Sequence, residues 1–125
     1  MHLAHVMIRV NDLEESIHFY TTMFGMKLQK KTENPEYQYT LVFLGCTDDP
    51  ASETLIELTY NWGKSSYQHG EAFGHLCFKV DDVYQACERI EKLGGVVTRK
   101  PGPVKGGTTV IAFIKDPNGY QIELI

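Results

Sequence analysis

The pattern of hydrophobic and polar positions repeats in the two halves of the chain. The stretch "HVMIRVNDL", residues 5–13, and the stretch "HLCFKVDDV", residues 75–83, share one order of residue types. Each has a histidine, an alternating apolar run with one basic residue, a valine, an aspartate and an aliphatic residue. Alternation with a period of two is typical of a half-buried strand. The sequence therefore predicts an internal repeat in which each copy opens with a strand that begins at a histidine.

Each of these strands precedes a segment with helical periodicity. In the first half Asp12 precedes "LEESIHFYTTMF", which ends at Gly25. In the second half Asp81 or Asp82 precedes "VYQACERIEKL", which ends at the glycine pair 94–95. Aspartate is a favoured N-cap and glycine is typical of a helix C-terminus. We therefore expect one helix per half.

Three short strand-like runs follow each predicted helix. They are "MKLQKKT", "YQYTLVFLGC" and "TLIELTY" in the first half, and "GVVTRK", "TTVIAFIK" and "YQIELI" in the second. The pattern predicts an α+β fold over residues 1–125, with two tandem βαβββ modules at about 1–60 and 74–125 joined by the polar segment 61–73. We expect curved mixed sheets with the helices outside.

The last strand of each half carries one glutamate in an otherwise apolar run, "LIELT" at 55–59 and "QIELI" at 121–125. Side chains alternate across a strand, so residues two apart share a face. This places His5 and Glu57 on the face away from the helix in the first half. His75 and Glu123 occupy the equivalent face in the second. The duplication therefore supplies two His/Glu pairs.

A carboxylate in an apolar strand costs several kcal/mol, roughly, unless a partner compensates it. A single His/Glu pair is equally compatible with ordinary solvated side chains, but the duplication favours a shared function. Two imidazoles and two carboxylates suit a divalent cation such as Ni²⁺, Co²⁺ or Zn²⁺. If two positions stay open, the metal is catalytic, and a carboxylate that leaves it becomes a base for a carbon-bound proton.

Composition excludes several other classes of protein. The net charge of −4 argues against non-specific nucleic-acid binding, which needs a basic face. No apolar run approaches the roughly 18 residues of a membrane span, and the alternating start "MHLAHVMIRV" does not resemble a signal peptide. Cys46, Cys77 and Cys87 are widely spaced without a CxxC motif, so we expect free thiols in a reducing cytoplasm rather than disulfides or a thiolate zinc site.

The chain resembles bacterial glyoxalase I (lactoylglutathione lyase) of the vicinal oxygen chelate superfamily along essentially its whole length. The most specific matches are "ENPEY", "IELTYNWG" and "KGGTT". The resemblance implies a glyoxalase-type fold and a homodimer with active sites between the subunits. It also implies isomerisation of the methylglyoxal–glutathione hemithioacetal to S-lactoylglutathione by proton transfer through a metal-bound enediolate, a reaction that detoxifies methylglyoxal.

The resemblance also assigns roles to residues. The metal ligands would be His5, Glu57, His75 and Glu123, the set that strand alternation selects. Glu123 would be the principal base, with Glu57 able to act from the opposite side of the substrate.

Substrate-binding positions follow from the same resemblance. Arg9 and Asn61 match the positions that hold the γ-glutamyl end of glutathione. Arg99, Lys100 and Lys105 lie where the family places bases for the glycyl carboxylate.

The compact connection "WGKSSYQHGEAFG" resembles that of the nickel- or cobalt-activated class rather than the longer zinc-dependent members, so we expect nickel, with cobalt possible and zinc as the alternative. His69 in this connection has no counterpart in the other half and is predicted to be a surface residue. Cys77 is predicted to be a small core residue, although it would sensitise the site to oxidation if it lay close.

Two other functions remain open. Another member of the superfamily, such as an epimerase acting beside a thioester, would use similar proton transfer. An extradiol dioxygenase would use only one carboxylate, and Glu57 argues against it. A non-catalytic dimer that binds a flat small molecule would need aromatic walls and no set of four metal ligands. Metal content separates the last alternative from the enzymes.

Overall fold

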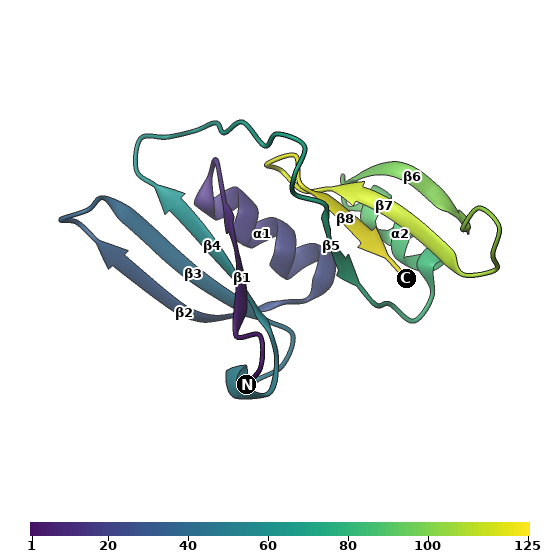
Figure 1. Cartoon of the computed structure of the whole chain (residues 1–125), viewed down its shortest axis with the longest axis horizontal. Helices are drawn as coiled ribbons and strands as arrows, with labels where there is room; N and C mark the ends of the chain where they lie inside the picture. The colour runs from purple at the N-terminus through teal and green to yellow at the C-terminus, as the bar shows by residue number, and fades with distance from the viewer. The chain divides into compact units, whose positions relative to one another are not determined.

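The computed structural model describes all residues from 1 to 125. The chain forms two compact units, Met1–Gln68 and His69–Ile125. Each unit contains a four-stranded sheet and one α-helix (Figure 1). The first contains β1 (His5–Arg9), α1 (Leu13–Phe24), β2 (Lys27–Asn34), β3 (Tyr39–Gly45), the 3₁₀ turn η1 (Pro50–Ser52) and β4 (Leu55–Asn61). The second contains β5 (His75–Phe78), α2 (Val83–Lys92), β6 (Val96–Pro103), β7 (Val110–Lys115) and β8 (Gln121–Leu124). The predicted α+β fold of two βαβββ modules is confirmed.

The two sheets have the same topology. Their strand orders are β1-β4-β3-β2 and β5-β8-β7-β6, with the first pair of each sheet parallel and the other pairs antiparallel. The repeat extends to the register, because Met7 lies opposite Glu57 in one sheet and Cys77 lies opposite Glu123 in the other. Equivalent side chains therefore occupy equivalent places in the two units.

Aspartates begin both helices, as predicted. The Asp12 carboxylate accepts a hydrogen bond from the Glu15 backbone N–H at 2.9 Å, and Asp82 accepts one from Gln85 at 2.9 Å. Of the two aspartates that the sequence left open for α2, Asp82 is the cap. Helix α1 ends at Phe24 and is capped by Gly25, whose φ of 65° lies in the left-handed region that glycine adopts most easily.

Burial confirms which face of each strand packs inward. In β1 the side chain of Ile8 is buried, as is Val10 just after the strand, while His5, Met7 and Arg9 are exposed. Each unit has its own apolar core, which includes Tyr20, Val42, Leu44 and Leu58 in the first and Ile90, Ile114, Ile122 and Leu124 in the second. The opposite faces keep the polar side chains. No helix is long and apolar enough to span a bilayer.

The loop between β3 and β4 is closed by one carboxylate. Glu53 accepts hydrogen bonds from the backbone N–H groups of Cys46 at 2.7 Å and Thr47 at 2.8 Å, and from the Thr47 hydroxyl at 2.9 Å. Burial on its own would raise the pKa of Glu53, but these hydrogen bonds outweigh it and hold the pKa below its usual value. The charged carboxylate therefore stabilises the loop that leads into β4.

We expect Glu53→Gln to lower the free energy of unfolding by about 1 kcal/mol at pH 7, because an uncharged amide accepts weaker hydrogen bonds than a carboxylate. Screening by solvent keeps the loss this small. The native pKa is lowered, so this stabilisation is complete above the unfolded-state pKa of about 4.3 and is lost as the pH falls through the native value. Urea denaturation at pH 7 and pH 3 measures both effects. Glu36→Gln, an exposed change in the β2–β3 turn, is the control. Equal stability of Glu53→Gln and wild type at pH 7 would contradict this role.

Candidate metal centre and active site

The first unit pairs an imidazole with a carboxylate on the face away from the helix. His5 Nε2 lies 2.9 Å from Glu57 Oε2, and the two side chains are 43% and 12% exposed. His5 is the first residue of β1, and its register partner on the parallel strand β4 is Leu55. Glu57 lies two positions further along β4. Strand alternation therefore selected two side chains that do meet.

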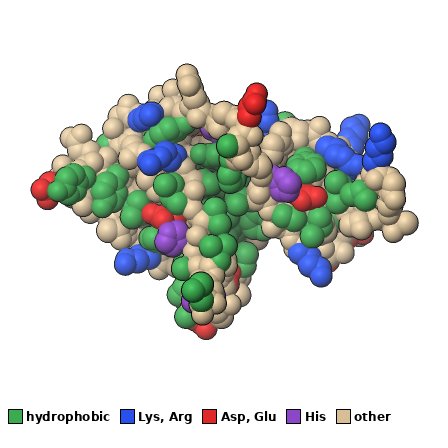
Figure 2. Space-filling model, in the orientation of Figure 1, with side chains coloured by type: hydrophobic (Ala, Val, Ile, Leu, Met, Phe, Trp, Pro, Cys, Tyr) green, Lys and Arg blue, Asp and Glu red, His purple; other side chains and the backbone are tan.

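The second unit repeats this pair. His75 Nε2 lies 2.9 Å from Glu123 Oε2, and the side chains are 40% and 19% exposed. The two residues lie on the parallel strands β5 and β8 with the same two-position offset. Figure 2 shows a histidine beside an acidic side chain over each unit, with hydrophobic side chains nearby. The two pairs thus share the residue types, the distance between histidine and glutamate, and the ring nitrogen that faces the carboxylate.

A phenylalanine supports each histidine, which the sequence analysis missed. The ring of Phe43 meets His5 edge-on, with centroids 5.5 Å apart, and Phe113 meets His75 in the same way at 5.2 Å. Each phenylalanine also lies opposite the glutamate of its pair in the sheet register. The signal was present in the sequence, because both the histidines and the phenylalanines recur at the same spacing along the chain. These rings restrict the orientation of the imidazoles.

The donor chemistry of each pair fits half of a divalent metal site. Imidazole nitrogen and carboxylate oxygen are the ligands that nickel, cobalt and zinc share, and each pair places one of each 2.9 Å apart. No group of three or more His, Cys, Asp or Glu side chains in the structure forms a metal site. Each unit therefore offers two donors of this kind.

A second polar pair lies further along the same two strands of the first unit. Arg9 Nη1 donates a hydrogen bond of 2.7 Å to Asn61 Oδ1. Arg9 lies opposite Thr59, so Asn61 is again two positions beyond the register partner, as in the His5–Glu57 pair. Arg9 and Asn61 therefore share the face of β1 and β4 that carries the His/Glu pair.

The three predicted basic residues of the second unit differ from one another. Arg99 donates hydrogen bonds to the backbone carbonyls of Ile111 at 2.9 Å and Pro103 at 3.1 Å, so its guanidinium braces the β6–β7 hairpin. Lys100 and Lys105 are exposed and make no ion pair.

The prediction that Cys77 is a core residue is wrong, because Cys77 is exposed. It lies on β5, an edge strand, and on the face of that strand away from the helix. Partial burial, the charge of Glu123 and a hydrogen bond to that carboxylate raise the pKa of the Cys77 thiol. The thiol is therefore neutral near pH 7, which slows its oxidation.

His69 is exposed, as predicted for a surface residue. Its ring stacks on Tyr120 with the centroids 4.3 Å apart.

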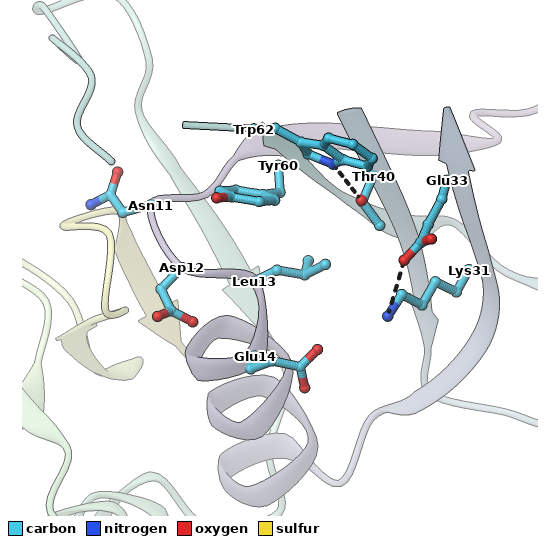
Figure 3. Close-up of a pocket in the computed structure, with 9 residues that line it drawn as sticks. All are labelled: Asn11, Asp12, Leu13, Glu14, Lys31, Glu33, Thr40, Tyr60 and Trp62. Atoms are coloured by element: carbon cyan, nitrogen blue, oxygen red, sulfur yellow. Dashed lines mark hydrogen bonds and ion pairs between the residues drawn. The ribbon is translucent and has the colours of Figure 1, made fainter. Parts of the chain in front are cut away.

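A pocket of about 480 Å³ in the first unit lies away from these polar pairs (Figure 3). It lies between the start of α1 and the sheet, where Leu13 faces Tyr60 and Thr40, and Trp62 Nε1 donates to Thr40 Oγ1 at 2.9 Å. Tyr60 alternates with the site-facing residues of β4, so the pocket opens on the opposite face of the sheet. The candidate site is therefore the face that carries the His/Glu pairs.

Comparisons with known proteins find relatives that match nearly the whole chain. The probable lactoylglutathione lyase of Vibrio cholerae is 58% identical over 123 residues, which cover 98% of this chain and 88% of that protein. The crystal structure of glyoxalase I from Zea mays matches with a TM-score of 0.94 and 49% identity over 98% of this chain, which spans only 43% of the maize chain. The trypanothione-dependent glyoxalase I of Leishmania major matches with a TM-score of 0.89 and 43% identity, over 100% of this chain and 86% of that one.

The family comparison covers nearly every residue. The model of the Glyoxalase/Bleomycin resistance protein/Dioxygenase superfamily matches residues 2–124, which include both His/Glu pairs. The resemblance seen in the sequence motifs is thus confirmed over both modules, and the chain belongs to this superfamily.

Proposed function

We propose that this chain is a metal-dependent lactoylglutathione lyase that isomerises the hemithioacetal of methylglyoxal and glutathione to S-lactoylglutathione. The observation that carries the proposal is its 58% identity, over 98% of its length, to a relative named as a probable enzyme of this kind. The two His/Glu pairs support it independently, because the isomerisation needs a base beside a polarised carbonyl.

The four ligands of the metal are His5, Glu57, His75 and Glu123, with nickel preferred over cobalt and zinc. The matching geometry of the two pairs supports this set. When bound, the cation supplies Lewis-acid stabilisation of the negative charge that develops on the substrate oxygen. The imidazoles hold their positions against Phe43 and Phe113.

Glu123 is the principal base in this proposal. Its carboxylate takes the proton from the substrate carbon that carries the sulfur and returns it to the neighbouring carbon. The hydroxyl proton on the first carbon moves to the oxygen of the second, so the substrate is isomerised with no net oxidation. Glu57 acts from the opposite side. The Glu123 side chain remains 19% exposed, as a group that must meet a substrate requires, whereas Glu57 is buried.

The functional assembly is a homodimer with two sites between subunits, each combining a His5–Glu57 pair with a His75–Glu123 pair. In this arrangement each unit contributes its His/Glu pair to a four-ligand site, and no group of three or more His, Cys, Asp or Glu side chains in the structure forms a metal site by itself. We place the reaction in the cytoplasm, where the three free cysteines remain reduced.

Glutathione is held at both ends in this proposal. Arg9 and Asn61 bind the γ-glutamyl end, which their shared hydrogen bond supports. Lys100 and Lys105 attract the glycyl carboxylate with their exposed ammonium groups. Arg99 contributes charge beside them while it braces its hairpin.

We expect Arg9→Ala to raise KM about tenfold or more with little change in kcat, because Arg9 binds a part of the substrate that does not react. Steady-state kinetics with the glutathione hemithioacetal measures the two constants. Arg89→Ala, on the exposed side of α2, is the matched control, because it also removes one guanidinium group. A fall in kcat at unchanged KM would contradict the assignment of Arg9.

The proposed function is tested by elemental analysis of the purified protein together with the rate of thioester formation under added Ni²⁺, Co²⁺ and Zn²⁺. We expect about one metal ion per chain and the highest rate with Ni²⁺. The same assay with trypanothione identifies the thiol carrier, which differs among relatives. A protein without bound metal that forms no thioester under any of the three ions would overturn the proposal.

A further inference from the structure

The connection after β4 returns to the candidate substrate site. The hydroxyl group of Tyr67 donates a hydrogen bond of 3.0 Å to Asn61 Oδ1, the same oxygen that accepts 2.7 Å from Arg9 Nη1. Tyr67 is half-buried and belongs to the same compact unit as Arg9 and Asn61. The Asn61 amide oxygen therefore links Arg9 to Tyr67, a residue that the sequence analysis did not select.

The two donors determine how the Asn61 amide is oriented. A guanidinium has no acceptor, so the Asn61 atom that faces Arg9 must be the oxygen. An amide oxygen accepts about two hydrogen bonds, and Arg9 and Tyr67 supply both. The Nδ2 group of Asn61 is then directed away from both partners, as a donor of two hydrogen bonds. A donor beside a guanidinium is suited to a carboxylate.

The backbone and a neighbouring lysine hold Tyr67 in this place. The Lys64 N–H donates to the Asn61 carbonyl at 3.0 Å, and Gly63 has a φ of 79°, so residues 61–64 form a tight turn. The Lys64 ammonium lies 4.5 Å from the centroid of the Tyr67 ring. The contact with Lys64 does not involve the hydroxyl group, so Tyr67→Phe removes the hydroxyl group and keeps this ring contact.

We infer that Tyr67 is a positioning residue that fixes the Asn61 amide so that Arg9 and Asn61 together present only donors to a carboxylate of the thiol carrier. This inference rests on the proposed function, in which that carboxylate belongs to the γ-glutamyl end of glutathione. Tyr67 thereby contributes to selection of the carrier without taking part in the proton transfer.

The test is Tyr67→Phe, which keeps the ring over Lys64 and removes only the hydroxyl group. We expect KM for the glutathione hemithioacetal to rise about three- to tenfold, the loss typical of one hydrogen bond, with kcat unchanged. The inhibition constant of S-methylglutathione should rise by the same factor. That of S-methylcysteinylglycine, which lacks the γ-glutamyl end, should not change. Tyr84→Phe, an exposed tyrosine on α2, is the matched control.

A double variant shows whether Tyr67 acts through Asn61. Tyr67→Phe should add nothing to the loss already caused by Asn61→Ala, since the amide that it orients is then absent. Additive losses, equal weakening of both inhibitors, or unchanged constants in an active enzyme would each overturn the inference alone. A wild-type protein that forms no thioester would overturn the proposed function and this inference together.

Discussion

Replacing Glu123 with glutamine should lower kcat for thioester formation by about two to four orders of magnitude, the usual contribution of a general base. Glutamine has nearly the same shape and keeps an oxygen near the His75 nitrogen, but it does not take up a proton at neutral pH. The backbone of Glu123 pairs with Cys77 and Phe113 through the sheet, and these contacts do not depend on the carboxylate. We therefore expect an intact fold with little turnover.

Glu57→Gln is the matched control, because Glu57 occupies the equivalent place in the other sheet, with the same 2.9 Å distance to its histidine. If Glu123 is the principal base, Glu57→Gln should cost less in kcat than Glu123→Gln. Thermal unfolding and metal content must be measured on both variants, so that a lost ligand is not mistaken for a lost base. Near-normal turnover by Glu123→Gln with its metal retained would contradict the assignment of the base.

The sequence was sufficient to predict the fold and the His/Glu pairs because both depend on short-range periodicity. Alternation along a strand places residues two apart on one face, and the duplication marks which of these positions belong together. Parallel pairing of β1 with β4 and of β5 with β8 then brings each histidine within 2.9 Å of its glutamate.

Other features could not be predicted from strand alternation. Strand β6 has register shifts on both sides of Arg99, so the direction of that side chain could not be counted from its neighbours. For Cys77 the error came from residue type, because alternation does place it on the exposed face of β5 with His75. The contact of Tyr67 with Asn61 depends on the turn at Gly63, which no periodic pattern describes.

Removal of either half of the metal set should abolish both metal binding and turnover. The double variants His5→Ala/Glu57→Ala and His75→Ala/Glu123→Ala each lose two of four proposed ligands. We expect activity below about 1% of wild type and little bound nickel in both, because the two remaining donors hold a divalent ion weakly. Chelation of the wild-type protein should have the same effect and should be reversed by added Ni²⁺.

Co-expression of these two double variants determines whether the site lies between subunits. In a two-fold dimer whose sites combine pairs from different chains, a mixed dimer has one site with all four ligands and one site with none. Random pairing then restores about a quarter of wild-type activity and of bound metal, since half of the dimers are mixed and each has one of two sites intact. Sites built within a single chain would restore neither. We expect recovery, because the proposed sites combine pairs from different chains. Mixed dimers without metal or activity would contradict the intersubunit site and would favour a site built from both pairs of one chain.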